Sequence, residues 1–294
     1  MSKPGDSNQI TRDYFDSLLL ETRYWDSDLP STHMELFGSA FETPIMTAAL
    51  SHLHGVCENG MVAIAEGAAA AGAVHWAGMT EEDELEDIIS TDAKTVKIIK
   101  PHLDDQVVLK KIEHANAHGA LAVGMDIDHC FSGNGAYDVV CGLPMHSKTT
   151  EDLRRYVNAS EVPFIVKGVL SVKDAEKCAE AGVKGIVVSH HHGIISYAVP
   201  PLMVLPEIKK AVGDKMKIFV DCGIESGMDV FKALALGADA VCVGRDLMEA
   251  LKNGGTAVTE RINQMNRELM TIMARTGAKS LNEIDPSVIH FRNF

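Results

Sequence analysis

Basic residues are scarce in this sequence, which has 27 Lys and Arg against 41 Asp and Glu and a formal net charge of −14. Proteins that bind nucleic acids use clustered Lys and Arg to neutralise phosphates, and no such cluster occurs along this chain. The same shortage disfavours binding to anionic membrane surfaces. We therefore expect neither a nucleic acid nor a membrane as a partner, and we expect a small molecule as the substrate.

Cysteine pairs and long apolar segments are lacking as well. The six cysteines form no C-x-x-C motif, and a chain of 294 residues does not need a disulfide framework, so we expect a cytoplasmic protein. The N-terminal segment MSKPGDSNQITRDYFDSLLLETRYW is polar and acidic, without the apolar centre of a signal peptide. Residues 61–79 are mostly apolar but contain Glu66, so we interpret them as a buried helix and strand rather than a membrane span.

Eight short apolar runs alternate with helical patterns along the chain. The runs are 44–50, 73–78, 96–100, 121–127, 163–169, 185–189, 217–221 and 240–244. Most of them are continuously apolar, as expected for parallel strands that are covered on both faces. Gly72, Gly119, Gly182 and Gly237 each follow a helical pattern and precede an apolar run, so we predict that they end helices. This repeated unit predicts an α/β fold, a (β/α)8 TIM barrel over 44–254.

The segments that flank the barrel are predicted to be helical in part. The N-terminal extension, 1–43, contains a predicted helix over 9–21, and the C-terminal part, 255–294, begins with a long amphipathic helix over 255–275. No linker rich in Pro, Gly or Ser divides the chain, so we predict a single domain over 1–294. The alternative is an open doubly wound sheet, which would carry a G-x-G-x-x-G turn after its first strand, where this chain has TAALSHLHG.

Polar residues gather where the predicted strands end, which is where such barrels place their active sites. These residues are Ser51, His52, His54, His75, Lys100, His102, Asp126, Asp128, His129, Lys167, Ser189, His190, His191, His192, Asp221, Gly244 and Arg245. Lys167 stands inside the otherwise apolar run PFIVKGV, and a buried ammonium group is costly unless it is paired. We predict that Lys167 faces a ligand, and the alternative is a structural ion pair with Asp128 or Asp221. The turn at 244–246, together with the loop at Gly223, offers backbone N–H groups to a phosphate. The alternative is that 244–246 is an ordinary tight turn between a strand and a helix.

Histidine is concentrated among these strand ends. Neighbouring residues point in opposite directions, so at most two of the three residues 190–192 face one site, and one of them is a plausible general base. A metal site that includes His52, His54, His75 and His129 is the alternative, although no spacing matches a known zinc motif. Packing and hydrogen bonding are the ordinary role of each histidine taken singly, and we assign no metal ligand.

Four stretches of the sequence resemble the FMN-dependent α-hydroxy acid dehydrogenase/oxidase family, which includes glycolate and lactate oxidases. They are VPFIVKGVLSVKDAEKCAEAGVKGIVVSHHHG, VPPLMVLPEIKKAV, FVDCGIESGMDVFKALALGADAVCVGRD and ELMTIMARTGAKSLNEI. The resemblance runs over 36–286 and is strongest over 162–284. It implies a (β/α)8 barrel, FMN as the cofactor, oxidoreductase activity and a homo-oligomer.

The resemblance also implies roles for individual residues. His191 corresponds to the base that removes the substrate hydroxyl proton while hydride passes to FMN, and Asp128 corresponds to the aspartate that supports this histidine. Lys167 corresponds to the lysine beside the N1/O2 edge of the flavin, where a cation stabilises the reduced anion. The implied cofactor-binding positions are the backbone at Thr47, Ala48 and Ala49 along the flavin ring, and Asp221, Gly223, Gly244 and Arg245 at the ribityl and phosphate groups.

The sequence departs from the family pattern at three residues. Ile194 stands where the family has the arginine that clamps the substrate carboxylate, and losing such a contact costs about 2–5 kcal/mol. Cys222 replaces a glycine, and Glu225 replaces an arginine near the phosphate position. The loop 129–147 is also short. We therefore expect a substrate other than a simple 2-hydroxy carboxylate.

Two alternatives follow from the same departures. The histidines and carboxylates would also serve a flavin-free lyase or isomerase on the same barrel, with or without a divalent metal. The missing arginine would also suit a non-catalytic relative that only binds a ligand.

Overall fold

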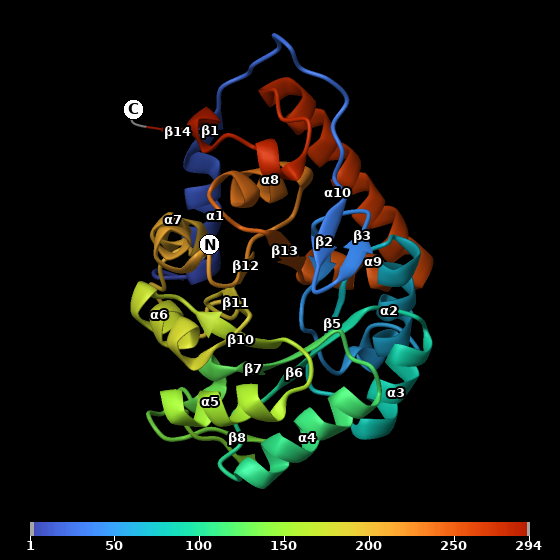
Figure 1. The fold of residues 1–294 in the computed structure, drawn as a ribbon, viewed down its shortest axis with the longest axis vertical. Helices are drawn as coiled ribbons and strands as arrows, with labels where there is room; N and C mark the ends of the chain where they lie inside the picture. Colours follow the sequence, from blue (N-terminus) through green and yellow to red (C-terminus); the bar gives the residue numbers. More distant parts are fainter. Residues whose placement is uncertain (1–2, 293–294) are drawn as a thin grey trace.

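The computed structural model describes residues 3–292 and contains an eight-stranded parallel sheet that curves into a barrel (Figure 1). Along the sheet the strand order is β4-β13-β12-β11-β10-β7-β6-β5, and a parallel bridge between Leu50 and Ala77 joins the two edge strands. The strands are β4 (Ile45–Thr47), β5 (His75–Ala77), β6 (Thr95–Ile99), β7 (Ala122–Asp126), β10 (Phe164–Val169), β11 (Gly185–Val188), β12 (Lys217–Val220) and β13 (Ala240–Val243). Each overlaps one of the predicted apolar runs, so the predicted (β/α)8 barrel is confirmed.

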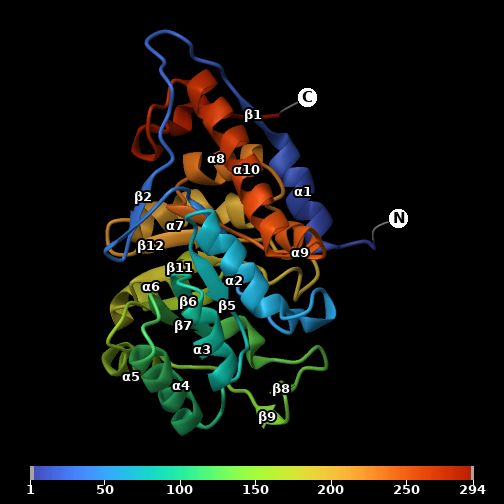
Figure 2. The ribbon, with the colours of Figure 1, turned by 90° about the vertical axis from the view of Figure 1, so that its right-hand side faces the viewer.

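Helices follow each strand of the barrel and cover its outer face (Figures 1 and 2). They are α2 (Gly60–Ala70), α3 (Glu82–Ser90), α4 (Asp105–Ala117), α5 (Thr150–Ala159), α6 (Val172–Ala181), α7 (Pro201–Val212), α8 (Gly227–Ala235) and α9 (Arg245–Leu251). Asp104, Ser171 and Ser226 cap α4, α6 and α8, because each side chain accepts a hydrogen bond from a backbone N–H in the first turn. Asn59 precedes α2, but its side chain makes no capping hydrogen bond.

Glycines end four of these helices, as the sequence predicts. Gly72, Gly119, Gly182 and Gly237 have φ angles of +63°, +80°, +86° and +115°. Side chains with a Cβ atom rarely adopt this left-handed region, whereas glycine enters it without steric cost. Each glycine therefore turns the chain from an outer helix back towards the next strand.

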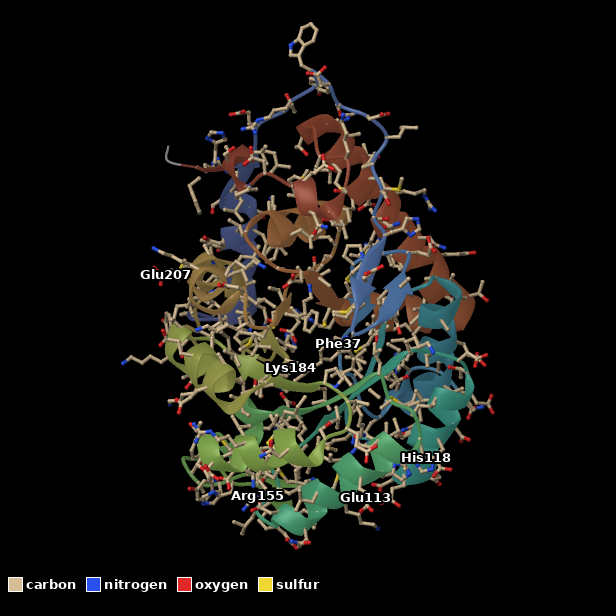
Figure 3. All side chains as sticks on the ribbon, in the orientation of Figure 1. Phe37, Glu113, His118, Arg155, Lys184 and Glu207 are labelled. Atoms are coloured by element: carbon tan, nitrogen blue, oxygen red, sulfur yellow. The ribbon has the colours of Figure 1, made fainter. Side chains whose placement is uncertain are left out.

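The core has two layers because the strands are buried on both faces. Outside the barrel, the strands pack against the surrounding helices. Inside it, Trp76 and Phe219 form an edge-to-face pair with ring centroids 5.4 Å apart. The hairpin of β2 (Met34–Leu36) and β3 (Ser39–Phe41) packs Leu36 and Phe41 into this inner layer. Figure 3 shows Phe37, from the turn of this hairpin, at the centre of the ring of strands. The hairpin therefore covers one end of the barrel and leaves the other end for a site.

The terminal segments pack onto the barrel and onto each other. The predicted helix over 9–21 is α1 (Ser7–Ser17), which ends earlier because the next residues form β1 (Leu18–Leu20), paired antiparallel with β14 (Ile289–Phe291). The predicted long helix is α10 (Gly255–Thr276), which packs against α2 and α8. The remaining elements are η1 (Leu53–Gly55), η2 (Ile127–Cys130), β8 (Val139–Val140), β9 (Leu143–Pro144), η3 (Leu281–Glu283) and η4 (Pro286–Val288). Within 3–292, no helix combines the length and the apolar character needed to cross a bilayer.

We predict that Gly119→Ala destabilises the protein by about 1–2 kcal/mol, because an added Cβ atom meets no neighbour within 4 Å but is held in the left-handed region. Gly133→Ala is the matched control, since that glycine is equally uncrowded and has no positive φ. Its free energy of unfolding should stay within about 0.5 kcal/mol of the parent value. Urea unfolding of the three proteins measures both effects, and equal losses in the two variants would contradict the argument.

Candidate active site

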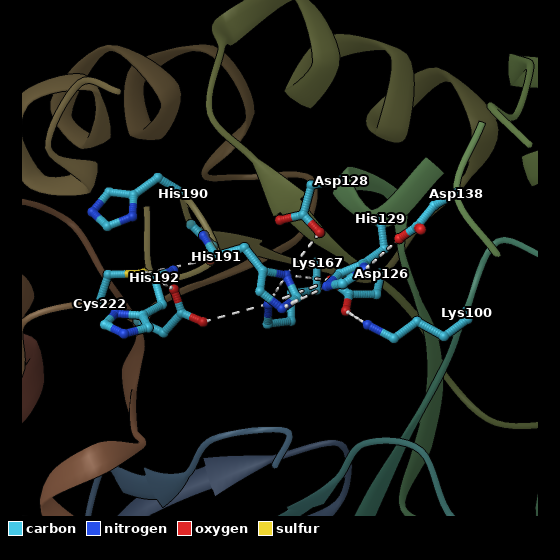
Figure 4. A network of polar contacts seen from close by, with 12 residues as sticks. Lys100, Asp126, Asp128, His129, Asp138, Lys167, His190, His191, His192 and Cys222 are labelled. Atoms are coloured by element: carbon cyan, nitrogen blue, oxygen red, sulfur yellow. Dashed lines mark hydrogen bonds and ion pairs between the residues drawn. The ribbon is translucent and has the colours of Figure 1, made fainter. Parts of the chain in front are cut away.

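The carboxylate of Asp126 is the centre of a polar cluster at the carboxyl ends of the strands (Figure 4). Asp126 ends β7 and is only 3% exposed. Lys100, just after β6, donates a hydrogen bond of 2.6 Å to Oδ2, and Lys167, on β10, lies 3.3 Å from Oδ1. Burial alone would raise the pKa of Asp126, but Lys167, His191 and Lys100 outweigh it and hold the pKa well below its usual value. Asp126 therefore stays ionised and is shared by two lysines.

His191 is bound to this cluster through its Nδ1 atom. Nδ1 lies 2.8 Å from Oδ1 of Asp128 and 3.3 Å from Oδ1 of Asp126. Burial lowers the pKa of His191, but the two carboxylates overcome this effect and raise it from 6.5 to about 9. Because the folded-state pKa is raised, this imidazolium stabilises the fold below about pH 6.5, and the contribution is lost as the pH rises through about 9.

His129 faces the other nitrogen of His191. The two Nε2 atoms lie 3.1 Å apart, and Nδ1 of His129 lies 3.6 Å from a carboxylate oxygen of Asp138. Burial and the charge of Lys100 lower the pKa of His129 to about 4, so its ring is neutral near pH 7. The neutral ring can accept a hydrogen bond from Nε2–H of the His191 imidazolium.

The spacing of Asp126, His129 and His191 also resembles a metal site, because one potential ligand atom from each lies within 4.8 Å of the others. The surrounding charges argue against a metal ion. Lys167 Nζ is 3.2 Å from Nδ1 of His191, and Lys100 Nζ is 2.6 Å from Asp126. Two ammonium groups this close would repel a divalent cation. The cluster is better suited to holding protons than to holding a metal.

A cavity of about 450 Å³ opens beside Lys167 and His191. Its lining comes from the carboxyl ends of β4, β10, β11, β12 and β13 and the residues after them: Ala48, Ala49, Leu50, Lys167, His191, His192, Asp221, Cys222, Gly223, Ile224, Glu225, Cys242, Gly244, Arg245, Asp246 and Met248. Asp221 lies 3.7 Å from Lys167 and so extends the charged cluster into the cavity. The volume is within the range of pockets that hold small molecules and cofactors.

Most of the residues predicted from the sequence meet at this cavity. Those that line it are Ala48, Ala49, Lys167, His191, Asp221, Gly223, Gly244 and Arg245. Asp128 lies behind His191, with Oδ1 2.8 Å from the Nδ1 atom of the ring. Thr47 is not part of the lining, because its fully buried hydroxyl contacts Nδ1 of His75 and accepts a hydrogen bond from the backbone N–H of Trp76. The assigned roles of all these residues stay predictions.

The three histidines 190–192 lie in a turn after β11, and their side chains separate there. His190 turns to α1, where its Nε2 atom lies 2.8 Å from the Thr11 hydroxyl, and only His191 joins the carboxylate cluster. His192 lines the rim of the cavity and contacts Asn8 through Nδ1 at 2.7 Å. His191 and His192 both have positive φ, at +47° and +56°, so the turn that aims His191 is a strained one.

The segment after this turn is tied to the N-terminus rather than to the cavity. The Ser7 hydroxyl donates to the carbonyl of Ile195 at 2.6 Å, and the N–H of Tyr197 donates to the carbonyl of Gly5 at 2.9 Å. Ile194 is 45% exposed and does not line the cavity. The position at which the family pattern has an arginine therefore supplies no cation to the site.

Sequence reasoning assigned no role to several members of the cluster. Asp126 was recognised as a strand end, but the pattern did not show that its carboxylate is shared. Lys100 was noted as a polar residue without a role, and His129 was considered only for the alternative metal site. Asp138 and the contacts of α1 were missed, because they depend on loop conformation. One signal could have found Asp126, since it stands two residues before Asp128 at the end of an apolar strand.

The profile of one protein family, described as FMN-dependent dehydrogenase, matches residues 2–153 and 144–291 of the chain. The chain belongs to this family. An L-lactate oxidase of Lactobacillus jensenii is 30% identical over 300 residues, which cover 91% of this chain and 73% of that protein. Human 2-hydroxyacid oxidase 2 is 27% identical over 98% of this chain and 92% of its own length.

Solved structures of mandelate oxidase share the fold of the whole chain. A variant of that enzyme with a brominated hydroxy ester superposes with a TM-score of 0.90 at 26% identity, over 99% of this chain and 93% of that one. The same variant with an FMN adduct gives a TM-score of 0.88 at 28% identity, over 98% and 92% of the two chains. Membership of this family makes the protein an FMN-dependent oxidoreductase.

The residues around the cavity suit FMN. Lys167 supplies a buried positive charge, and Gly223 and Gly244 leave backbone close to the cavity without side chains. Arg245 is exposed at the rim, and its one hydrogen bond within 3–292 is a long contact of 3.4 Å with the Asn8 side chain. Its charge is therefore free to meet a phosphate. Glu225 lines the same rim and would oppose that phosphate, so Arg245 has to outweigh it.

We predict that Arg245→Gln weakens the binding of FMN at least tenfold, because a hydrogen bond to a charged group contributes about 1.5–3 kcal/mol. Riboflavin, which lacks the phosphate, should bind this variant as it binds the parent. Arg267→Gln is the matched control, since Arg267 is an exposed arginine on α10, outside the cavity lining. Fluorescence titrations of each protein with FMN and riboflavin measure the effect. Equal losses for the two flavins would contradict a phosphate-binding role.

Proposed function

We propose that the protein oxidises the hydroxyl-bearing carbon of a small organic substrate that lacks a carboxylate beside that carbon. His191 acts as the base, Asp128 supports it, and Lys167 lies at the flavin. The observation that carries this proposal is the meeting of His191 and Lys167 at one cavity, with Asp128 2.8 Å behind the histidine. FMN, when bound, supplies the acceptor for the hydride.

The residues of the cluster have different roles in the transfer of the substrate's hydroxyl proton. Once Nε2 of His191 has lost its proton, with a pKa of about 9, this nitrogen, which points away from the carboxylates, takes the hydroxyl proton. Asp128 and Asp126 stabilise the imidazolium that forms, through its Nδ1–H. Lys167 keeps its proton, because Asp126 and Asp221 outweigh burial and raise its pKa above the usual value. It therefore offers a fixed positive charge for negative charge that develops in the cavity.

The charges around His191 favour a substrate without an adjacent carboxylate. In the described part of the chain no arginine belongs to the cluster, since Arg154 pairs with Glu180 and Arg155 pairs with Asp105 on the outer helices. The two lysines of the cluster, Lys100 and Lys167, both pair with Asp126, and Lys167 also lies 3.7 Å from Asp221. A carboxylate beside the reacting carbon would find no unpaired cation there, at a cost of about 2–5 kcal/mol.

We also propose that the chain forms one domain and works as a cytoplasmic homo-oligomer. The flanking segments support the first point, since β1 pairs with β14 and α10 packs on the barrel helices. The cysteines of the described residues are all free thiols, which suits a reducing compartment. The homo-oligomer rests on the family resemblance alone, because the apolar face of α10 already packs against α2 and α8.

The test compares acids with their uncharged amides as reductants of the FMN-loaded protein. Under anaerobic conditions, flavin absorbance reports the rate with L-lactate and L-lactamide, and with mandelate and mandelamide. We expect each amide to reduce the flavin at least tenfold faster than its acid, because the acid brings an unpaired carboxylate to the cluster. Faster reduction by the acids would overturn the substrate assignment.

His191→Asn in the same assay tests the base. The variant should lower the rate with the amides by about 10²–10⁴-fold, because general base catalysis contributes that much. His33→Asn is the control, since His33 is an exposed histidine outside the cavity lining. Unchanged reduction by His191→Asn would overturn the role of this residue without touching the substrate assignment.

A further inference from the structure

A second cavity, of about 210 Å³, lies on the outer side of β6, beyond the catalytic cluster. Lys97 alternates along β6 with Val96 and Ile98, which belong to the inner layer of the barrel, so its side chain leaves the outer face of the strand. The cavity is closed by the segment after β5, by α4 and by the hairpin of β8 and β9. None of the cofactor-binding residues predicted above lines it.

Two lysines give this cavity a positive charge that is not neutralised by direct pairing. Lys97 is 3% exposed, and its ammonium donates to the carbonyls of Gly78 and Thr80, at 2.6 and 3.4 Å, and to the hydroxyl of Thr80. All three acceptors are neutral. Lys111, on α4, lines the cavity and has no hydrogen bond or ion pair within residues 3–292. Burial and the nearby charge of Lys111 lower the pKa of Lys97 to about 7, which agrees with a missing counter-ion.

A buried histidine nitrogen in the lining also lacks a partner. His102 is 7% exposed, and its Nδ1 atom is buried without any hydrogen bond among the described residues. Leaving a buried polar atom unpaired costs roughly 1–3 kcal/mol, so such an atom beside a cavity indicates a missing ligand group. Glu81 and Glu84 also line the cavity and equal Lys97 and Lys111 in formal charge, but neither forms an ion pair with these lysines in the part of the chain described.

The rest of the lining is apolar and limits the size of a ligand. Ile99, Val140 and Leu143 contribute to the wall. A volume of about 210 Å³ corresponds to roughly seven water molecules, at about 30 Å³ each. A ligand of this size with one acidic end and one apolar end would match both parts of the lining.

We propose that this cavity binds a small organic carboxylate, with the acid group at Lys97, Lys111 and His102 and the hydrocarbon part against Val140 and Leu143. The site is separate from the flavin cavity and does not depend on the reaction proposed above. Lys100 lines the cavity and also holds Asp126 at 2.6 Å, so an acid bound there would act on the catalytic cluster through this lysine.

The test is a calorimetric titration of the FMN-loaded protein with butyrate, compared between two neighbouring lysines of α4. Lys111 lines the cavity, whereas Lys110 is exposed and pairs with Glu82 at 3.2 Å. We expect one butyrate per chain, at least tenfold weaker binding in Lys111→Gln, and unchanged binding in Lys110→Gln. Both substitutions are on the helix surface and leave the flavin cavity intact.

Three results would overturn the proposal. They are the absence of saturable butyrate binding, the same affinity in Lys111→Gln as in the parent, and binding of inorganic phosphate as tightly as butyrate, which would remove the role of the apolar wall. The outcome is independent of the proposed reaction, because the same titration works on the flavin-free chain. A protein that binds butyrate but is never reduced by a substrate would leave this site standing and overturn the reaction instead.

Discussion

One buried carboxylate, that of Asp126, holds the site together. Its oxygens lie 2.6 Å from Lys100, 3.3 Å from Lys167 and 3.3 Å from His191, so it connects the carboxyl ends of β6, β7, β10 and β11. A buried carboxylate without partners would be strongly destabilising, and the two lysines would be equally costly without it. Each charged residue of the cluster therefore needs the others to be stable in its buried position. It keeps Lys167 charged and His191 basic beside the flavin cavity.

The barrel supplies the geometry that this cluster requires. Parallel strands all end at one rim, so residues far apart in the sequence, such as Lys100 and His191, meet there without long loops. The β2–β3 hairpin fills the opposite end of the barrel. Helix α1 then fixes the rim from outside, because Thr11 contacts His190 and Asn8 contacts both His192 and Arg245. This N-terminal helix links the turn that carries the base to the proposed phosphate-binding side of the cavity.

The repeating pattern of the sequence was enough to predict the barrel, and the strand ends were enough to predict where the site lies. Lys167 could be singled out because a charged residue inside an apolar strand needs a partner. The partner itself could not be chosen, since Asp126, Asp128 and Asp221 all follow apolar runs and only side-chain geometry separates them. The backbone at Thr47 was expected along the flavin, which stays a prediction, and its side chain turns outward to His75 because alternation along β4 places Met46 inside the barrel.

The central claim is that the carboxylates of Asp126 and Asp128 bind Nδ1–H of His191 and raise its pKa. Nitrogen NMR of the His191 ring in the flavin-free protein tests this claim most directly. Selective labelling with ¹⁵N-histidine and the spectrum of His191→Asn identify its signals among the 13 histidines. The account predicts a pKa of about 9, with Nδ1 keeping its proton through the titration and Nε2 losing its own. A pKa at or below the ordinary value of 6.5, or loss of the proton from Nδ1, would contradict it.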